Sequence, residues 1–400
     1  MLGLGAVSLF TDISTEMIYP LLPVFLAGVL GAHASFIGAI EGAAETTASL
    51  LKLLSGWWSD RIKTRKPFVV VGYLIASIAR PFTGAAHSAT QVLGIRLTDR
   101  VGKGLRSSPR DALLADSVHA DARGLAYGFH AAADNTGAVL GPLIAFFLLK
   151  LNGVGALDSS RRLSAHDEHA IRNVFWLSAI PAAIAVLILI VVVRDVKRQD
   201  AETKQTGTLA QSGKLSGRFW MYLTVVLLFT LGNSTDAFLL LRANQLGVPV
   251  ALAPILWAVL NFVKAATGTY GGQLSDRVGR KPLIVGGWIL YAAVYFAFAW
   301  AGAPWQAWAL FAVYGIFYGM TEGTEKALVA DIVPTLRRGA AFGWYNLAIG
   351  LGALPASLIF GWIWDRSGPV SAFVFGATLA LIAAVLMMFV APSGRLREAK

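Results

Sequence analysis

Long apolar runs separated by short polar segments recur along almost the whole chain. A helix of about 20 apolar residues crosses the roughly 30 Å hydrocarbon core of a bilayer. The pattern predicts an all-α polytopic membrane protein with twelve spans, at residues 2–29, 35–58, 67–87, 89–113, 123–150, 172–194, 218–244, 250–274, 281–302, 304–330, 340–364 and 368–392. The first run has no basic leading segment and no small-residue cleavage site, so we expect it to be kept as a span.

Composition agrees with a membrane protein and excludes several other classes. Hydrophobic residues make up 56% of the chain and charged residues only 14%, against about 25% charged in soluble domains. A net charge of +11 would suggest a nucleic-acid partner in a soluble protein, but here Lys and Arg gather in alternate loops. The positive-inside rule then predicts both termini in the cytoplasm, and we expect a bacterial inner-membrane protein with no nucleic-acid partner. The absence of cysteine excludes disulfides and thiolate metal sites.

The sequence contains an internal repeat. The segment GWWSDRIKTRKP from residue 56 returns as GQLSDRVGRKP from residue 272. Three further pairs lie 215 residues apart, namely Asp116 and Asp331, Arg123 and Arg338, and Gly128 and Gly343. A repeat at one offset predicts a duplicated six-helix unit. We therefore expect two pseudo-symmetric six-helix bundles at residues 1–194 and 218–400, joined by a polar linker at 195–217.

These repeated motifs resemble those of the major facilitator superfamily over essentially the whole chain. The second loop copy matches its motif A through Gly272, Asp276, Arg277, Gly279, Arg280 and Lys281. The first copy keeps Gly56, Asp60, Arg61, Arg65 and Lys66, but it has one extra residue and lacks the loop glycine. Arg100 followed by Gly104 resembles motif B. The resemblance implies the major facilitator fold, transport by rocking of the two halves, and a monomer.

Two further motifs bear on the direction of transport. Gly137, Gly141 and Pro142 have the spacing of the family's motif C, which is associated with antiporters, although Ala145 and Phe146 replace its closing glycines. Pro20 and Pro23 resemble the Pro-x-x-Pro of drug exporters in the same family. This resemblance implies export of a small organic solute in exchange for protons.

The fourth predicted span carries a stripe of charge. On a helical wheel the polar positions fall within an arc of about 120°, and they are Arg96, Asp99, Arg100, Lys103, Arg106, Ser107 and Arg110. Insertion scales assign about 2.5–3.5 kcal/mol to each Arg, Lys or Asp at the membrane centre. The first five charges would together cost on the order of ten kcal/mol or more in lipid, which is comparable with the stability of a typical domain. We therefore expect this face to line a wet cavity or to meet acidic partners.

Acidic residues of neighbouring spans are the candidate partners and proton carriers. A carboxyl group in a cavity of low dielectric constant can exchange protons near neutral pH. The candidate proton-coupling residues are Asp12, Glu16, Glu41, Glu45 and Asp134, with Glu16 and Glu45 nearest to mid-span. The alternative is that acids and bases simply neutralise one another and lock the bundle.

Candidate solute-binding residues are the polar side chains at mid-span. They are Arg96, Arg100, Lys103, His130 and Asn135 in the first half, and Asn233, Asp236, Asn261, Lys264, Tyr318 and Glu322 in the second. Arg100 and Lys103 are the best placed to hold an anionic group. The neighbouring acids are equally compatible with a neutral or cationic drug, so the sequence leaves the charge of the solute open. Trp257, Tyr314 and Tyr318 are compatible with a cavity wall or with plain packing.

Charged residues near the span ends are candidates for a gate. They are Asp60, Arg61, Arg106, Arg110, Asp111, Asp276 and Arg277. An acid at a helix end can pair with its own arginine or with the positive end of a neighbouring helix. The positive-inside rule alone would explain the basic residues of these loops, but not the repeated Gly-x-x-x-Asp.

Other function classes lack their motifs. The chain has no phosphate-binding Gly-x-x-x-x-Gly-Lys loop, no HExxH and no GxSxG, so we expect neither ATP drive nor an enzyme, and no cofactor or metal. His166 and His169 have a metal-compatible spacing, but a solvated surface is the simpler interpretation. We expect the partners to be a small-molecule substrate, protons and the lipid bilayer. The alternatives are a proton-coupled uptake symporter, a uniporter or lipid flippase, and a non-transporting receptor.

Overall fold

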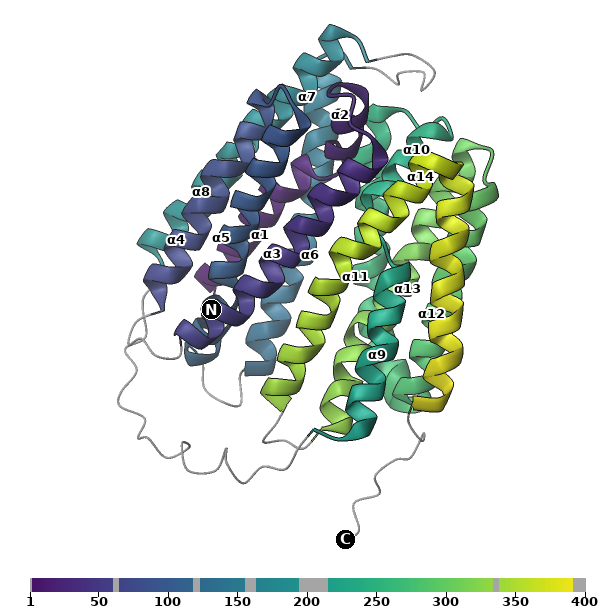
Figure 1. The fold of residues 1–400 in the computed structure, drawn as a ribbon. Helices are drawn as coiled ribbons and strands as arrows, with labels where there is room; N and C mark the ends of the chain where they lie inside the picture. Colours follow the sequence, from purple (N-terminus) through teal and green to yellow (C-terminus); the bar gives the residue numbers. More distant parts are fainter. Residues whose placement is uncertain are drawn as a thin grey trace.

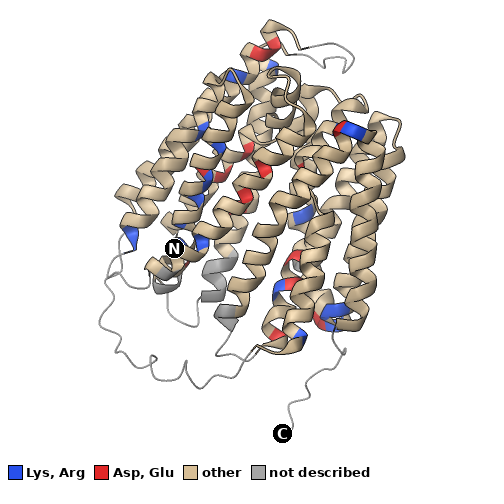
Figure 2. Cartoon of the chain, viewed as in Figure 1, with Lys and Arg blue, Asp and Glu red and all other residues tan. Residues whose placement is uncertain are grey.

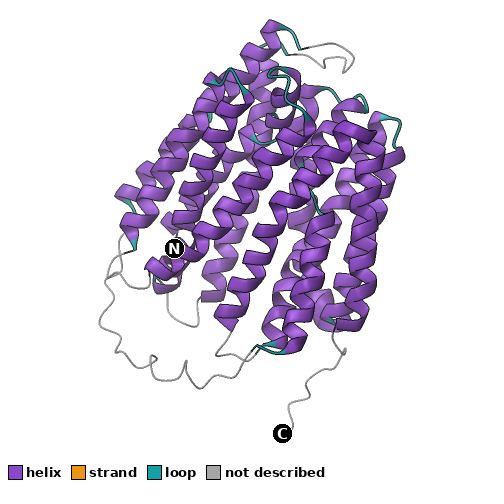
Figure 3. Ribbon diagram, in the orientation of Figure 1, coloured by secondary structure: helices purple, strands orange, loops and turns teal. Residues whose placement is uncertain are grey.

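The computed structural model describes residues 2–59, 65–117, 123–154, 163–193, 215–333 and 338–390. All regular structure within these residues is helical (Figures 1 and 3). Of the predicted gate, Asp60 and Arg61 lie outside the described residues, as does most of the predicted linker at 195–217.

The first half of the chain forms six rods. They are α1 (Leu2–Ile18) with α2 (Leu22–Gly28), α3 (Ala34–Ser59), α4 (Lys66–Ala79) with the 3₁₀ turn η1 (Arg80–Ala85), α5 (Ala89–Asp116), α6 (Arg123–Leu151), and α7 (Ala165–Leu177) with α8 (Ala179–Val191). The break between α1 and α2 contains Pro20, which cannot donate a helical hydrogen bond. The sixth rod begins earlier than predicted because Ser164 and Asp167 form a capping box at its start.

The second half also forms six rods. They are α9 (Gly217–Gly232) with α10 (Ala237–Gln245), η3 (Val250–Leu252) with α11 (Ala253–Val278), α12 (Arg280–Trp300), α13 (Pro304–Ile332), and the two arms of α14 (Arg338–Val390). The arms of α14 meet at Gly368, whose φ of 82° is non-helical, and Pro369 follows it. This left-handed conformation favours glycine because it has no Cβ.

The twelve predicted spans correspond to these rods. Eight helical segments among the described residues are long and apolar enough to cross a membrane, and one of them, Ala341–Val390, holds both arms of α14. Three further helices, α3, α5 and α13, also have the length of a span, but each carries several charged residues. Figure 2 shows charged positions within the bundle as well as at its ends. The charged spans are therefore the helices that line the polar interior described below.

The rods fall into two packed groups. Most of the helices α1 to α8 contact mainly one another, and so do most of α9 to α14, whereas α2 and α3 contact the second group as extensively as the first. In Figure 1 the first group begins in purple and the second ends in yellow. The groups meet where α3 packs on α14 and where α6 packs on α11. The exact domain boundaries at 194 and 218 stay a prediction.

Helices α3 and α14 approach each other backbone to backbone. A Cβ atom added at Gly38 would clash with the carbonyl oxygen of Ser357, and one added at Gly42 would lie 2.7 Å from Cα of Leu354. Small residues allow this close approach between membrane helices. The seam between the two groups therefore depends on the absence of side chains at these positions.

A carboxylate from one group caps a helix of the other. Asp365, near the end of the first arm of α14, accepts hydrogen bonds from the backbone N–H groups of Ala34 at 3.0 Å and Ser35 at 2.8 Å. These N–H groups belong to the first turn of α3, where the helix dipole favours a negative charge. At the same end of the molecule α2 packs on α10 (Figure 1). This end, opposite to the start of α1 and the end of α14, is thus held closed by contacts between the two groups.

The seam can be tested with two glycine substitutions. We expect Gly38→Ala to lower the melting temperature of the purified protein by several degrees, because overpacking costs about 1–3 kcal/mol. The control is Gly286→Ala on α12, where an added Cβ meets nothing within 4 Å. A helical Gly→Ala change there should be neutral or stabilising by up to about 1 kcal/mol. Equal melting temperatures for the two variants would contradict a close-packed seam.

The cap can be tested by hydrogen exchange. We expect Asp365→Ala to speed exchange of the amides at the start of α3 by roughly fivefold, because a lost cap costs about 1 kcal/mol. The matched control is Arg366→Ala, since Arg366 lies over the ring of Trp362 at 4.9 Å and not on α3. Mass-spectrometric exchange rates that are unchanged in Asp365→Ala would rule out this contact between the groups.

Candidate functional site

A polar cavity of about 550 Å³ lies between the two groups of helices. Its wall includes residues of α1, α3, α5, α11, α13 and α14. The charged residues on the wall are Asp12, Glu16, Glu41, Glu45, Arg80, Asp99, Arg100, Lys103, Arg106, Asp236, Lys264, Glu322, Glu325 and Lys326. The cavity thus gathers acids and bases from both halves of the chain.

A network of ion pairs fixes the start of α5. Arg96 donates two hydrogen bonds to the carboxylate of Glu41 on α3, at 3.0 and 2.6 Å. Arg80 donates to Asp99 at 2.8 Å and also reaches the hydroxyl of Ser14 on α1 at 3.2 Å. The arginines and both carboxylates are buried. Because a buried charge is stable only when it is paired, these pairs lock α1, α3, η1 and α5 together.

Three further bases follow along α5 and face the cavity. Arg100 is 7% exposed, and its Nε lies 3.9 Å from a carboxylate oxygen of Asp99. Lys103, one turn on, forms no ion pair with the described residues. Arg106 is 6% exposed, and its Cζ lies 4.1 Å from the ring centre of Tyr73. The charge stripe of α5 therefore changes from fully paired at Arg96 to weakly paired further along the helix.

Two glycines of α6 set the position of the acids on α1. An added Cβ at Gly137 would lie 2.8 Å from Cβ of Asp12, and one at Gly141 would lie 2.9 Å from Cβ of Glu16. Helix α1 can therefore approach α6 only because these positions have no side chain. The glycines that resemble motif C lie behind two of the candidate proton carriers.

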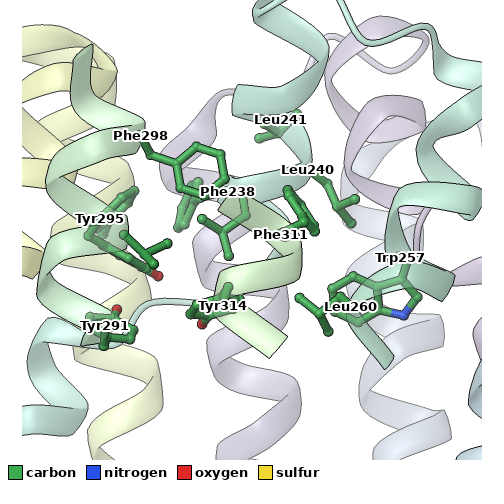
Figure 4. Close-up of a cluster of buried hydrophobic side chains, with 14 of the residues drawn as sticks. Phe238, Leu240, Leu241, Trp257, Leu260, Tyr291, Tyr295, Phe298, Phe311 and Tyr314 are labelled. Atoms are coloured by element: carbon green, nitrogen blue, oxygen red, sulfur yellow. The ribbon is translucent and has the colours of Figure 1, made fainter. Parts of the chain in front are cut away.

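A hydrogen bond connects the two halves inside the cavity. Nε1 of Trp257 on α11 donates to Glu16 on α1 at 2.6 Å. The ring of Trp257 also contacts the ring of Tyr19, with centroids 4.8 Å apart. In Figure 4 Trp257 lies apart from the cluster of tyrosine and phenylalanine rings. Trp257 thus lies on the part of the cavity wall where the two halves of the chain meet.

Tyrosines surround the acid at the start of α10. Asp236 accepts hydrogen bonds from the hydroxyl groups of Tyr314 at 2.8 Å and Tyr318 at 3.1 Å. Behind them, Tyr291 and Tyr295 stack with ring centroids 4.2 Å apart (Figure 4). A neutral donor satisfies a buried carboxylate without cancelling its charge. Asp236 is therefore held as an acceptor by its own half of the chain.

Two more acids on α13 have partners from the second half. Glu322 forms ion pairs with Lys264 at 2.9 Å and Lys326 at 3.2 Å. Glu325 accepts hydrogen bonds from Nε1 of Trp288 at 2.8 Å and from the hydroxyl of Tyr345 at 2.7 Å. These contacts satisfy the acids of α13 within one half.

A small polar group lies between α1 and α6, away from the cavity wall. The hydroxyl of Ser8 donates to Asp134 and lies 3.4 Å from Nε2 of His130. His130 is buried, and its Nε2 lies 3.8 Å from Asp134. Neither His130 nor Asp134 lines the cavity.

The candidate gate residues differ in their surroundings. Asp276 pairs with Arg280 at 2.5 Å, and Arg280 also reaches Asp331 at 3.3 Å. Arg110 pairs with Asp111 at 2.9 Å. Arg277 is exposed, and Arg106 lines the cavity.

The structure brings together most of the predicted site. The candidate residues on the cavity wall are Asp12, Glu16, Glu41, Glu45, Arg100, Lys103, Arg106, Asn233, Asp236, Lys264, Tyr318 and Glu322. Those away from the wall are Arg96, His130, Asp134, Asn135 and Asn261. Arg96 is occupied by Glu41, and Asn261 donates to the backbone oxygen of Trp257 at 3.1 Å. Within the described residues no three metal-ligating side chains gather.

Four charged residues of the cavity wall were not among the candidate site residues. They are Arg80, Asp99, Glu325 and Lys326. Arg80 carried a usable signal, since an arginine inside an apolar run needs a buried partner.

Comparisons with known proteins agree on the family. The sequence matches the Major Facilitator Superfamily over residues 4–354 and 239–400. An uncharacterised MFS-type transporter of Methanocaldococcus jannaschii is 31% identical over 395 residues, which cover 97% of this chain and 94% of that protein. The multidrug resistance protein MdtH of an Enterobacter species is 26% identical over 157 residues, 39% of each chain.

Solved transporter structures share this fold. A bacterial homologue of the human lysosomal transporter Spinster, solved in an inward-facing and occupied conformation, superposes with a TM-score of 0.79 at 17% identity, over 100% of this chain and 98% of that one. Such a likeness at low identity establishes the twelve-helix fold. From this fold and the sequence matches together, we conclude that this chain belongs to the Major Facilitator Superfamily and is a secondary transporter, not an enzyme.

Proposed function

We propose that the protein moves a small organic solute by alternating access and couples this movement to protons. The observation that carries the proposal is the hydrogen bond between Glu16 and Trp257, which joins the two halves inside the cavity. The cavity volume of about 550 Å³ falls within the range of small-molecule sites, about 300–1,000 Å³.

Protonation of Glu16 would act directly on the contact between the halves. A carboxylate accepts a stronger hydrogen bond than a neutral carboxyl group does, because the charge assists the bond. Uptake of a proton at Glu16 therefore weakens its bond to Trp257 and loosens α1 from α11. Asp12 lies one turn away on the same wall and is the next site for the proton. This is a way for a proton to bias the rocking of two halves.

Two coupling directions fit this mechanism. Export by antiport is supported by the motif C glycines, which position the acids of α1, and by the partial likeness to a multidrug resistance protein. Uptake by symport is supported by the weakly paired bases of α5, which favour an anion that binds together with protons. A uniporter or a lipid flippase would need no titratable contact between the halves. We place both termini in the cytoplasm from the basic loops and propose a monomer in the bacterial inner membrane.

The role of Glu16 can be tested in proteoliposomes. With a pH gradient and an entrapped pH-sensitive dye, a panel of organic solutes should give solute-driven proton movement in the wild type. We expect Glu16→Gln to reduce this movement at least tenfold, because the amide cannot carry the proton. The matched control is Glu168→Gln, which removes an acid outside the cavity that pairs with Arg172.

Two results would count against proton coupling through Glu16. One is solute movement in the wild type that does not depend on the pH gradient. The other is full proton movement in Glu16→Gln.

We expect Trp257→Phe to retain proton binding but to uncouple it from transport, so that protons leak without solute.

A further inference from the structure

The bases of α5 have hydrogen-bonding capacity that the protein does not use. Nε of Arg100 and Nη1 of Arg106 are buried and have no hydrogen-bond acceptor among the described residues. Both side chains line the cavity. A buried donor without an acceptor costs the desolvation of that group, and the cost is larger when the group is charged. These two guanidinium groups therefore have unused donor capacity for an acceptor that enters the cavity.

The nearest acids do not supply that acceptor. Asp99 is the acid closest to Arg100, but it accepts from Arg80 at 2.8 Å while Nε of Arg100 lies 3.9 Å away. Glu41 is held by Arg96. Glu45 lines the same wall, yet it forms no hydrogen bond or ion pair with the described residues. The neighbouring acids thus balance the charge of α5 at longer range and leave its donors open.

The acids on the cavity wall formed by the second half, in contrast, have hydrogen-bond or ion-pair partners. The three acids of this wall are already bonded by groups of the second half, as the contacts of Asp236, Glu322 and Glu325 show. No described side-chain acceptor of these acids is buried without a donor. Among the described residues of the cavity wall, the fully buried polar side-chain atoms that lack a partner are therefore the donors of Arg100 and Arg106.

We infer that the solute is an organic anion whose carboxylate, phosphonate or phosphate group binds Arg100 and Lys103, with Arg106 as a further donor. An oxyanion matches the planar fork of a guanidinium group and a neighbouring ammonium group. The rings of Tyr19 and Trp257 line the same cavity and give an apolar surface for the body of the solute. This inference rests on the proposed transport function and specifies its substrate class.

Whether protons and the anion help or oppose each other's binding follows from the charges around the α5 bases. Charged groups of several elements share the cavity with Arg100 and Lys103. They are Asp12 and Glu16 on α1, Glu41 and Glu45 on α3, Arg80 on η1, Asp99 and Arg106 on α5, Asp236 at the start of α10, Lys264 on α11, and Glu322, Glu325 and Lys326 on α13. Lys52 and Arg96 lie off the wall but act on Glu45. Arg80 and Arg96 hold Asp99 and Glu41 as ion pairs, and the acids of the second half are bonded within that half. The acids left to take up protons are therefore Asp12 and Glu16. Each proton that they bind removes a negative charge near the α5 bases. Protons and the anion therefore bind together, which selects symport over antiport.

The anion site can be tested without knowing the natural solute. The chain has no cysteine, so the full-length variant Thr15→Cys, on the cavity wall, is labelled at one position. The probes are the anionic sulfonatoethyl and the cationic trimethylammonioethyl methanethiosulfonates. Their rate ratio is independent of thiol ionisation, because both react with the thiolate.

We expect Arg100→Gln to lower the ratio of anionic to cationic labelling about threefold or more, since one charge acts oppositely on the two reagents. Lys103→Gln should lower it as well, which provides a second variant if the first does not fold. The matched control is Arg218→Gln, an exposed arginine at the start of α9, which should leave the ratio unchanged. Benzoate or phenylphosphonate should slow labelling, whereas benzamide and benzylamine should not.

The anion site is refuted if both α5 variants keep the wild-type ratio, or if benzamide protects as well as the two anions do. The coupling sign has its own test, because Asp12→Asn, on the cavity wall, should raise the ratio as acidic pH does. A lower ratio in Asp12→Asn would overturn symport. Failure of the proposed function is a separate result: proton movement would be absent in proteoliposomes while the ratio still depended on Arg100.

Discussion

The need to keep charges inside a bilayer away from lipid, either in ion pairs or in a polar cavity, determines much of this structure. Lipid offers no hydrogen-bond partner and no ion of opposite charge. Arg80 and Arg96 can lie in spanning helices because Asp99 and Glu41 meet them there. Each pair joins different helices, so the cost of burying charge becomes a constraint on how these helices pack. The arrangement of α3, η1 and α5 follows from that constraint.

The two halves satisfy the same requirement by different chemistry. The first half uses ion pairs between arginine and carboxylate, whereas the second half surrounds two of its acids with tyrosine and tryptophan donors. These acids, Asp236 and Glu325, are bonded by neutral groups, and the aromatic rings behind them pack into one buried cluster (Figure 4). The duplicated fold thus has one wall with unpartnered arginine donors and one wall whose acids are bonded within their own half. This difference makes the two walls of the cavity chemically unequal, although the two halves of the fold are related by pseudo-symmetry.

The sequence predicted the twelve rods because hydrophobic length and helix breakers are local signals. It also predicted that Arg100 and Lys103 face a polar interior, since their spacing placed them on one side of a helix. It did not predict which acid pairs with which base: Arg96 was a candidate for solute binding, but Glu41 occupies it. Pairings such as that of Glu16 with Trp257 join residues 241 positions apart. They depend on how helices are placed in space, and no local pattern encodes that placement.

The seam between α3 and α14 has a mechanical consequence. Its contacts at Gly38 and Gly42 are made mainly by backbone against backbone, with side-chain atoms of Phe238 and Leu354 beside them. Few side chains interlock there, so the two helices can shift relative to each other largely as rigid bodies. Polar contacts hold the seam where Asp365 caps the first turn of α3 and where the hydroxyl of Thr46 donates to the backbone oxygen of Gly350 at 2.5 Å. Movement along the seam must therefore break these contacts.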